Sequence, residues 1–152
     1  MTPESDSKQY IAFRLDKEEF AFEISVVKEI FPTQNITKVH RSPSYIEGVM
    51  NLRGKLVTVI DLRKRFKLDA RKVDENSRII VIDAADAPVG FLVDEVTEVA
   101  RLATETIEPV PAYVADGIES EYVIGIAKVG ERLITLVDPL KILELSSEEV
   151  KS

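Results

Sequence analysis

The sequence contains no cysteine and no tryptophan, and His40 is its only histidine in 152 residues. Without cysteine, disulfides, thiolate metal sites and cysteine nucleophiles are excluded. Any histidine-dependent catalytic or metal site would have to use His40, which lies in a polar connector, and no G-x-S-x-G motif is present. The six glycines form neither G-x-G-x-x-G nor a P-loop pattern. We therefore expect a protein that is not an enzyme and that holds no metal or cofactor.

Long apolar runs are also missing, since none approaches the roughly 18 residues of a membrane span. The first ten residues are polar and acidic, so we expect no signal peptide and a cytoplasmic location. The net charge is −7, whereas nucleic-acid binders are usually basic. A small β-barrel can still bind single strands when aromatic and basic residues alternate. Phe66 is the one aromatic in the basic stretch 53–67, and we expect it to point inward.

The basic stretch 53–67 has two interpretations. Asp61 is its only acidic residue, and its basic residues are Arg53, Lys55, Arg63, Lys64, Arg65 and Lys67. Such a run is commonly a solvated face. It would alternatively be a docking surface for an acidic partner protein.

The chain contains an internal duplication. Residues 8–30 align with 77–99 without a gap, and 45–61 align in the same way with 122–138. Both blocks occur in the same order, and the extra length falls between them, where insertions cost little. Identical pairs include Tyr45 and Tyr122, Gly48 and Gly125, Leu56 and Leu133, Asp61 and Asp138, and Glu29 and Glu98.

Each copy predicts about five short strands. Alternating apolar residues and turn signals place them at 10–15, 20–24, 26–31, 49–51 and 56–60, and again at 78–83, 88–94, 95–101, 122–128 and 132–137. We expect short helices after Ser42 and Asp61 and a final helix after Asp138, because these residues can cap a helix. The fold class is therefore all-β, with two small barrels at about 20–70 and 77–138 that the terminal segments complete. Residues 1–7 and 146–152 are expected to be flexible ends.

Several strands are apolar on both faces, including 79–82 and 56–60. One face of such a strand would fill the barrel interior. The other face must then be covered by the sister barrel or by a partner.

Arg53 lies at the turn of a predicted hairpin, where the second copy has Gly130. Glycine suits a tight two-residue turn, and turn geometry does not require arginine. The side chain is either an exposed, solubilising arginine or an anchor for a partner, since arginine is favoured at interface hot spots.

Residues 48–62, GVMNLRGKLVTVIDL, resemble the signature of the CheW family of chemotaxis coupling proteins. Segments 20–30, 43–48, 89–99 and 131–143 resemble further family segments in the right order, so that one domain would span about 8–145. The resemblance implies two packed, five-stranded barrels of the Src-homology-3 type. It also implies a non-enzymatic adaptor between the cytoplasmic tips of methyl-accepting chemoreceptors and the CheA histidine kinase.

The resemblance implies partners and sites as well. An apolar surface would meet the regulatory domain of CheA, a groove between the barrels would take the helical receptor tip, and adaptor and kinase could close into rings at membrane-associated receptor arrays. Matched positions imply that partners contact Val27, Glu29, Val49, Asn51, Arg53, Gly54 and Val99. Two alternatives stay open: a CheW-like scaffold for a kinase of a pathway other than motility, and a small nucleic-acid-binding barrel.

Overall fold

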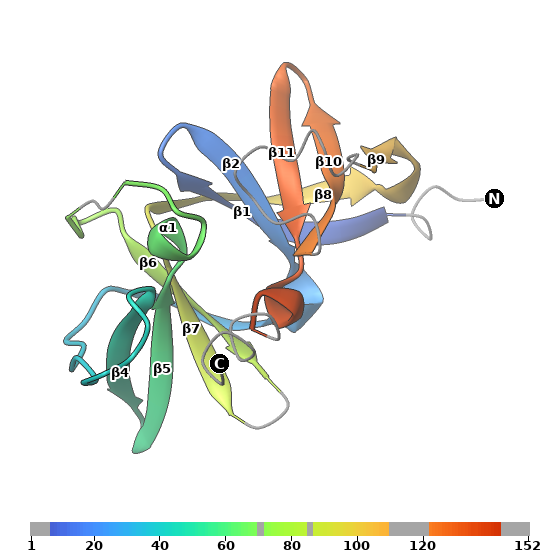
Figure 1. The fold of residues 1–152 in the computed structure, drawn as a ribbon. Helices are drawn as coiled ribbons and strands as arrows, with labels where there is room; N and C mark the ends of the chain where they lie inside the picture. Colours follow the sequence, from blue (N-terminus) through green and yellow to red (C-terminus); the bar gives the residue numbers. More distant parts are fainter. Residues whose placement is uncertain (1–6, 70–71, 85–86, 110–121, 144–152) are drawn as a thin grey trace.

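The structure is a computed structural model that describes residues 7–69, 72–84, 87–109 and 122–143. It is built almost entirely from short strands, as the sequence predicts (Figure 1). The strands are β1 (Ser7–Leu15), β2 (Glu18–Glu23), β3 (Val27–Pro32), β4 (Ile46–Leu52), β5 (Lys55–Asp61), β6 (Arg78–Asp83), β7 (Pro88–Val93), β8 (Glu95–Ala103), β9 (Ile107–Glu108), β10 (Val123–Val129) and β11 (Arg132–Val137). The four-residue helix α1 (Leu62–Arg65) follows β5, and residues 139–143 are helical. The turns η2 (Ile24–Val26) and η3 (Thr104–Thr106) are 3₁₀ helices.

The strands form two sheets, each of which makes one small barrel. One sheet has five strands in the order β3-β6-β7-β5-β4, and the other has six in the order β8-β1-β2-β11-β10-β9. The sixth strand is only the two-residue β9, which pairs with β10. The all-β fold of two small barrels is therefore confirmed.

The two repeats exchange strands. The five-stranded barrel combines β3, β4 and β5 of the first repeat with β6 and β7 of the second, and the other barrel uses the remaining strands of both (Figure 1). The pairing is symmetric. β2 runs parallel to β11 just as β7 runs parallel to β5, and Val27 faces Ile82 just as Val96 faces Phe13. The barrels therefore do not follow the expected bounds of 20–70 and 77–138, because each hairpin pairs with the other repeat.

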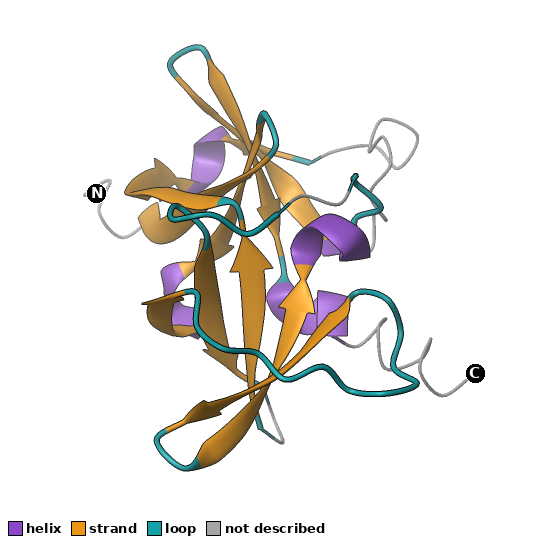
Figure 2. Ribbon diagram, turned by 90° about the vertical axis from the view of Figure 1, so that its left-hand side faces the viewer, coloured by secondary structure: helices purple, strands orange, loops and turns teal. Residues whose placement is uncertain are grey.

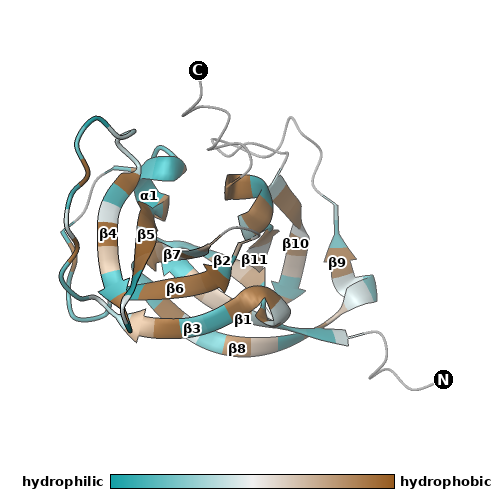
Figure 3. Ribbon diagram, turned by 90° about the horizontal axis from the view of Figure 1, so that it is seen from below, coloured by the Kyte–Doolittle hydropathy of each residue, from teal (hydrophilic) through white to brown (hydrophobic). Residues whose placement is uncertain are grey.

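Three apolar clusters explain why strands are apolar on both faces. Alternate residues of β6 separate into two of them, since Ile79 and Val81 lie inside the five-stranded barrel while Ile80 and Ile82 face the sister barrel. A third cluster, around Ala12 and Ile134, fills the six-stranded barrel. Strand β6 is brown over much of its length in Figure 3. The sister barrel thus covers the second apolar face, which was one of the two possibilities.

Equivalent aspartates begin both helices, which lie on one side of the molecule (Figure 2). Asp61 Oδ1 accepts from the Arg63 amide at 2.9 Å, and Asp138 Oδ1 accepts from the Leu140 amide at 2.9 Å. Burial raises the pKa of Asp61, against the opposing effect of the Lys64 and Arg63 amides that donate to it. The helix expected after Ser42 is absent, because Ser42 Oγ donates to the Val39 carbonyl at 2.8 Å instead of capping. Residues 44–45 form a turn there.

Within the described ranges, no helix has the length and apolar character needed to cross a membrane. The same ranges contain no cluster of three or more His, Cys, Asp or Glu side chains arranged to hold a metal ion. Of the expected flexible ends, 1–6 and 146–152 lie outside the described residues. Ser7 belongs to β1 and is not part of a loose end.

Candidate functional site

The hairpin between β4 and β5 carries Arg53 and Gly54 at its tip. Both residues have positive φ, 51° for Arg53 and 84° for Gly54. Positive φ at both central residues is typical of a type I′ turn, whose twist matches that of the flanking strands. In the second hairpin Gly130 occupies the Arg53 position with φ of 63°. The first hairpin therefore places arginine where a residue with a Cβ is sterically unfavourable.

Side chains from two strands hold Arg53 in this conformation. Nη1 donates to Glu29 Oε2 at 2.9 Å, and Nη2 donates to Glu29 Oε1. The guanidinium carbon lies 6.0 Å from the centre of the Phe31 ring, which also comes from β3. Asn51 Oδ1 accepts from the Gly54 amide at 2.9 Å and closes the turn from below. We name this group of Glu29, Phe31, Asn51, Arg53 and Gly54 the hairpin corner.

The hairpin corner presents charge to solvent in a fixed direction. The Arg53 side chain is 66% exposed and that of Glu29 is 27% exposed. The hydrogen bonds from Arg53 lower the pKa of the Glu29 carboxyl, and the bonds to Glu29 raise the pKa of the guanidinium. Two of the five guanidinium N–H groups face Glu29, and the fork geometry of the others suits a carboxylate or carbonyl of a partner.

The second barrel makes the related ion pair differently. Glu98, the equivalent of Glu29, pairs with Arg132 Nη2 at 2.5 Å, and Arg132 also donates from Nε to Glu19 Oε1 at 2.8 Å. Arg132 lies two residues beyond the position that corresponds to Arg53. Its side chain is 40% exposed. An arginine–glutamate pair is therefore kept in both barrels, but only the first barrel places it at the tip of its hairpin.

The structure brings four of the seven predicted site residues together. Asn51, Arg53 and Gly54 lie on the hairpin, and Glu29 meets them from β3. Phe31 was missed by the sequence reasoning, although its place two residues after Glu29 on the same face of a strand could have indicated it.

The three predicted valines are not members of the hairpin corner. Val49 is half-buried on β4 and exchanges backbone hydrogen bonds with Thr37. Val27 packs against the cluster between the barrels, so core packing accounts for part of its role. Val99 is 54% exposed on β8, in the six-stranded sheet and not in the sheet that holds Arg53.

The basic stretch 53–67 does not form one exposed face. Arg63 and Arg65 are buried, Arg53 pairs with Glu29, and Lys64 lies 3.6 Å from Glu47. Phe66 is 2% exposed and points inward, as expected. Three of the six positive charges in this segment, those of Arg53, Arg63 and Lys64, are therefore paired with carboxylates of the protein, which weakens both the acidic-partner and the nucleic-acid interpretations.

Comparisons with known proteins agree with this architecture. The family model described as the CheW-like domain matches residues 9–147. The chain belongs to the CheW family. It is a chemotaxis adaptor, and nothing in the described part of the chain favours a nucleic-acid binder.

Individual CheW proteins are similar along nearly the whole chain. Chemotaxis protein CheW of Klebsiella aerogenes is 38% identical over 97% of this chain and 87% of its own length. The CheW protein of Helicobacter pylori is 36% identical, over 90% of this chain and 81% of its own. The crystal structure of the scaffolding protein TtCheW from Thermoanaerobacter tengcongensis superposes with a TM-score of 0.79 at 37% identity, covering 86% of this chain and 83% of that one.

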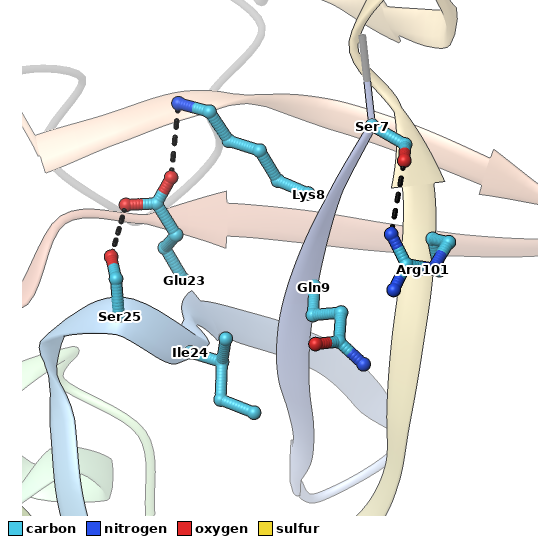
Figure 4. A pocket seen from close by; sticks show the side chains of 7 residues that line it. All are labelled: Ser7, Lys8, Gln9, Glu23, Ile24, Ser25 and Arg101. Carbon is cyan, nitrogen blue, oxygen red and sulfur yellow. Dashed lines mark hydrogen bonds and ion pairs between the residues drawn. The ribbon is translucent and has the colours of Figure 1, made fainter. Parts of the chain in front are cut away.

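A pocket of about 240 Å³ lies away from the hairpin corner, at the start of β1 and the η2 crossover (Figure 4). Its polar groups bond to one another. Glu23 pairs with Lys8 at 3.0 Å and accepts from Ser25 Oγ at 2.8 Å, and Arg101 donates to Ser7 Oγ at 3.2 Å. The charged groups of this pocket, Lys8, Glu23 and Arg101, are therefore partnered within the protein.

Proposed function

We propose that this chain couples the cytoplasmic tips of chemoreceptors to a CheA histidine kinase, and that it catalyses no reaction itself. Membership of the CheW family and the scaffolding role named for TtCheW support this proposal. The chain would work in the cytoplasm, recruited to receptor arrays at the membrane. An apolar surface would meet the kinase regulatory domain, a groove between the barrels would take the receptor tip, and adaptor and kinase could alternate in rings.

The observation that carries the site proposal is the geometry of Arg53. An exposed arginine ordinarily samples many rotamers, and binding must then immobilise it at an entropic cost. Here Glu29 and Phe31 fix the guanidinium before any partner arrives. We infer that the hairpin corner is a pre-oriented anchor for a receptor carboxylate or carbonyl. Asn51 and Gly54 support it by fixing the turn, and Val27, Val49 and Val99 are proposed as further partner contacts.

A reconstituted kinase assay tests the function. CheA autophosphorylation is measured with receptor-containing membranes, with and without this protein, and receptor-dependent activation should require it. Turnover of a substrate by the purified protein alone, or kinase control that is unchanged when the protein is left out, would contradict the proposal.

Variants in the same assay test the site. Arg53→Gly reproduces the tip of the second hairpin, suits the positive φ and removes the guanidinium. It should remain folded and lose receptor-dependent kinase control. Arg101→Gln is the matched control. Arg101 is also exposed, but it lies with its partner Ser7 on the six-stranded barrel, away from the hairpin corner. If Arg53→Gly and the unmodified protein control the kinase equally, the hairpin corner is not the receptor anchor. The proposed adaptor function would be unaffected by that result.

A further inference from the structure

A partly buried ion network lies at the joint between the two barrels. Arg63 Nη1 donates to Asp94 Oδ2 at 2.6 Å and to Asp16 Oδ1 at 2.8 Å, while Nε donates to the Asp69 carbonyl at 3.0 Å. The side chains of Arg63 and Asp94 are only 7% and 10% exposed. Asp94 Oδ2 also accepts from the Asp16 amide at 2.8 Å, so the three residues are bonded to one another in a closed set.

The three residues of this network come from different parts of the fold. Arg63 lies on α1, which continues β5 of the five-stranded barrel, and Asp16 lies in the turn between β1 and β2 of the six-stranded barrel. Asp94 is the single residue between β7 and β8, where the chain leaves one sheet for the other. The network therefore joins one barrel, the other barrel and the crossover between them.

The ion network is not repeated at the equivalent crossover between β2 and β3. In the internal repeat, Leu140 stands at the position of Arg63, and Ser25 stands at that of Asp94. Leu140 is 43% exposed. Ser25 lies in the second crossover and donates to Glu23, only two residues away, at 2.8 Å. One crossover is thus tied to both barrels by charge, whereas the other is tied locally.

We propose that Asp16, Arg63 and Asp94 form a latch that fixes the orientation of one barrel relative to the other. The latch acts at the crossover between β7 and β8, where Asp94 lies. The apolar cluster between the barrels holds them together, but hydrophobic burial is not directional. Charge-assisted hydrogen bonds are directional, and a buried charge separated from its partner is strongly disfavoured. A rotation of the barrels that moves Asp16 away from Arg63 is therefore opposed at the β7–β8 crossover. Relative movement of the barrels would instead separate them at the other crossover, where η2 joins β2 to β3.

The absence of cysteine allows a direct distance measurement. Spin labels placed through Leu56→Cys on β5 and Thr104→Cys in η3 report on opposite barrels, and both positions are exposed. Double electron–electron resonance then gives the distribution of distances between the barrels. Asp16→Gly, which suits the φ of 58° at this turn, and Arg63→Leu, which copies Leu140, should broaden the distribution and shift its mean.

Arg132→Leu is the matched control. Arg132 also binds two carboxylates, Glu19 and Glu98, but β11, β2 and β8 belong to one sheet. This variant should keep the distance distribution of the labelled parent. The proposal is overturned if folded Asp16→Gly keeps the parent distribution, or if Arg132→Leu broadens it as much. If Arg63→Leu does not fold, Asp16→Gly alone tests the proposal. The side chain of Asp16 is 47% exposed, so its removal leaves the apolar core intact.

Discussion

Gly48 occupies the most crowded glycine position in the described chain, at the bulge in the pairing of β4 with β5. Its φ is +148°, and a Cβ there would lie 2.2 Å from the carbonyl oxygen of Thr37 and 2.8 Å from Cγ2 of Ile36. Real Cβ atoms do not approach a backbone oxygen so closely, so Gly48→Ala must push the Thr37 segment away from β4.

The cost of Gly48→Ala follows from the contacts that this displacement breaks. Thr37 and Val49 exchange two backbone hydrogen bonds of 2.8 Å each. Their loss costs roughly 0.5–1.5 kcal/mol per bond. The unfavourable φ adds about 1–3 kcal/mol. The sum is about 2–6 kcal/mol, a large part of the roughly 5–15 kcal/mol that stabilises a domain.

Gly54→Ala is the matched control, because Gly54 also has positive φ but a Cβ added to it would have no neighbouring atom within 4 Å. Only the backbone term remains, about 1–2 kcal/mol. Urea unfolding followed by far-ultraviolet circular dichroism measures both variants, and the midpoint should fall without a change in slope. If Gly48→Ala loses no more stability than Gly54→Ala, the Thr37 segment is free to move and the argument from crowding is refuted.

Three further predictions concern charge and burial. Arg53→Ala should raise the pKa of Glu29 toward its ordinary value and leave that of Glu23, which bonds Ser25 and Lys8, unchanged; carboxyl-carbon NMR titration checks both. Glu19 has a lowered pKa in the folded state through Arg132, so its contribution to stability is present at neutral pH and lost as pH falls. The stability difference between the parent and Arg132→Leu should therefore shrink in urea unfolding at acid pH, and a difference that grows would contradict this sign. Ile80→Ala, between the barrels, should cost about 2–5 kcal/mol, whereas Leu56→Ala, at a side chain 68% exposed, should stay within about 0.5 kcal/mol in the same unfolding measurement.

Much of the fold could be read from local patterns. The alternation in 132–137 predicts β11 with its observed ends, and the predicted strand 26–31 is largely the strand β3. Asp61 and Asp138 could be predicted as helix caps because an aspartate side chain just before a helical turn can accept hydrogen bonds from the first backbone amides of the helix. The prediction of a helix after Ser42 was wrong. The Ser42 hydroxyl donates to the carbonyl of Val39, which precedes it, and does not accept from the amides that follow, as a helix cap would.

The exchange of strands could not be read in this way. The comparison of repeats shows which strands are equivalent, but a hairpin such as β1–β2 has the same pattern whether it pairs within its own repeat or with the other. Its partner depends on the lengths and directions of the crossovers, and these are tertiary properties.

The charges of the candidate site were partly hidden for a similar reason. Arg53 and Glu29 were both named from the resemblance, yet nothing in their spacing of 24 residues indicates that they bond each other. Arg63 looks like a surface residue in a basic run, because burial of a guanidinium depends on acids far away in sequence, here Asp16 and Asp94. Partners this distant become visible only when the sheets are assembled.

The exchanged strands also determine when the molecule can fold during its synthesis. β2 pairs with β11 at Ala21 and Leu136, so the first hairpin is made by the ribosome more than a hundred residues before its parallel neighbour. Such distant pairing is slow to form, and an unpaired strand edge can associate with other chains. Neither half of the nascent chain contains a complete barrel. The five-stranded barrel needs only residues 27–93 and can close first, whereas the six-stranded barrel must wait for the last hairpin, β10–β11.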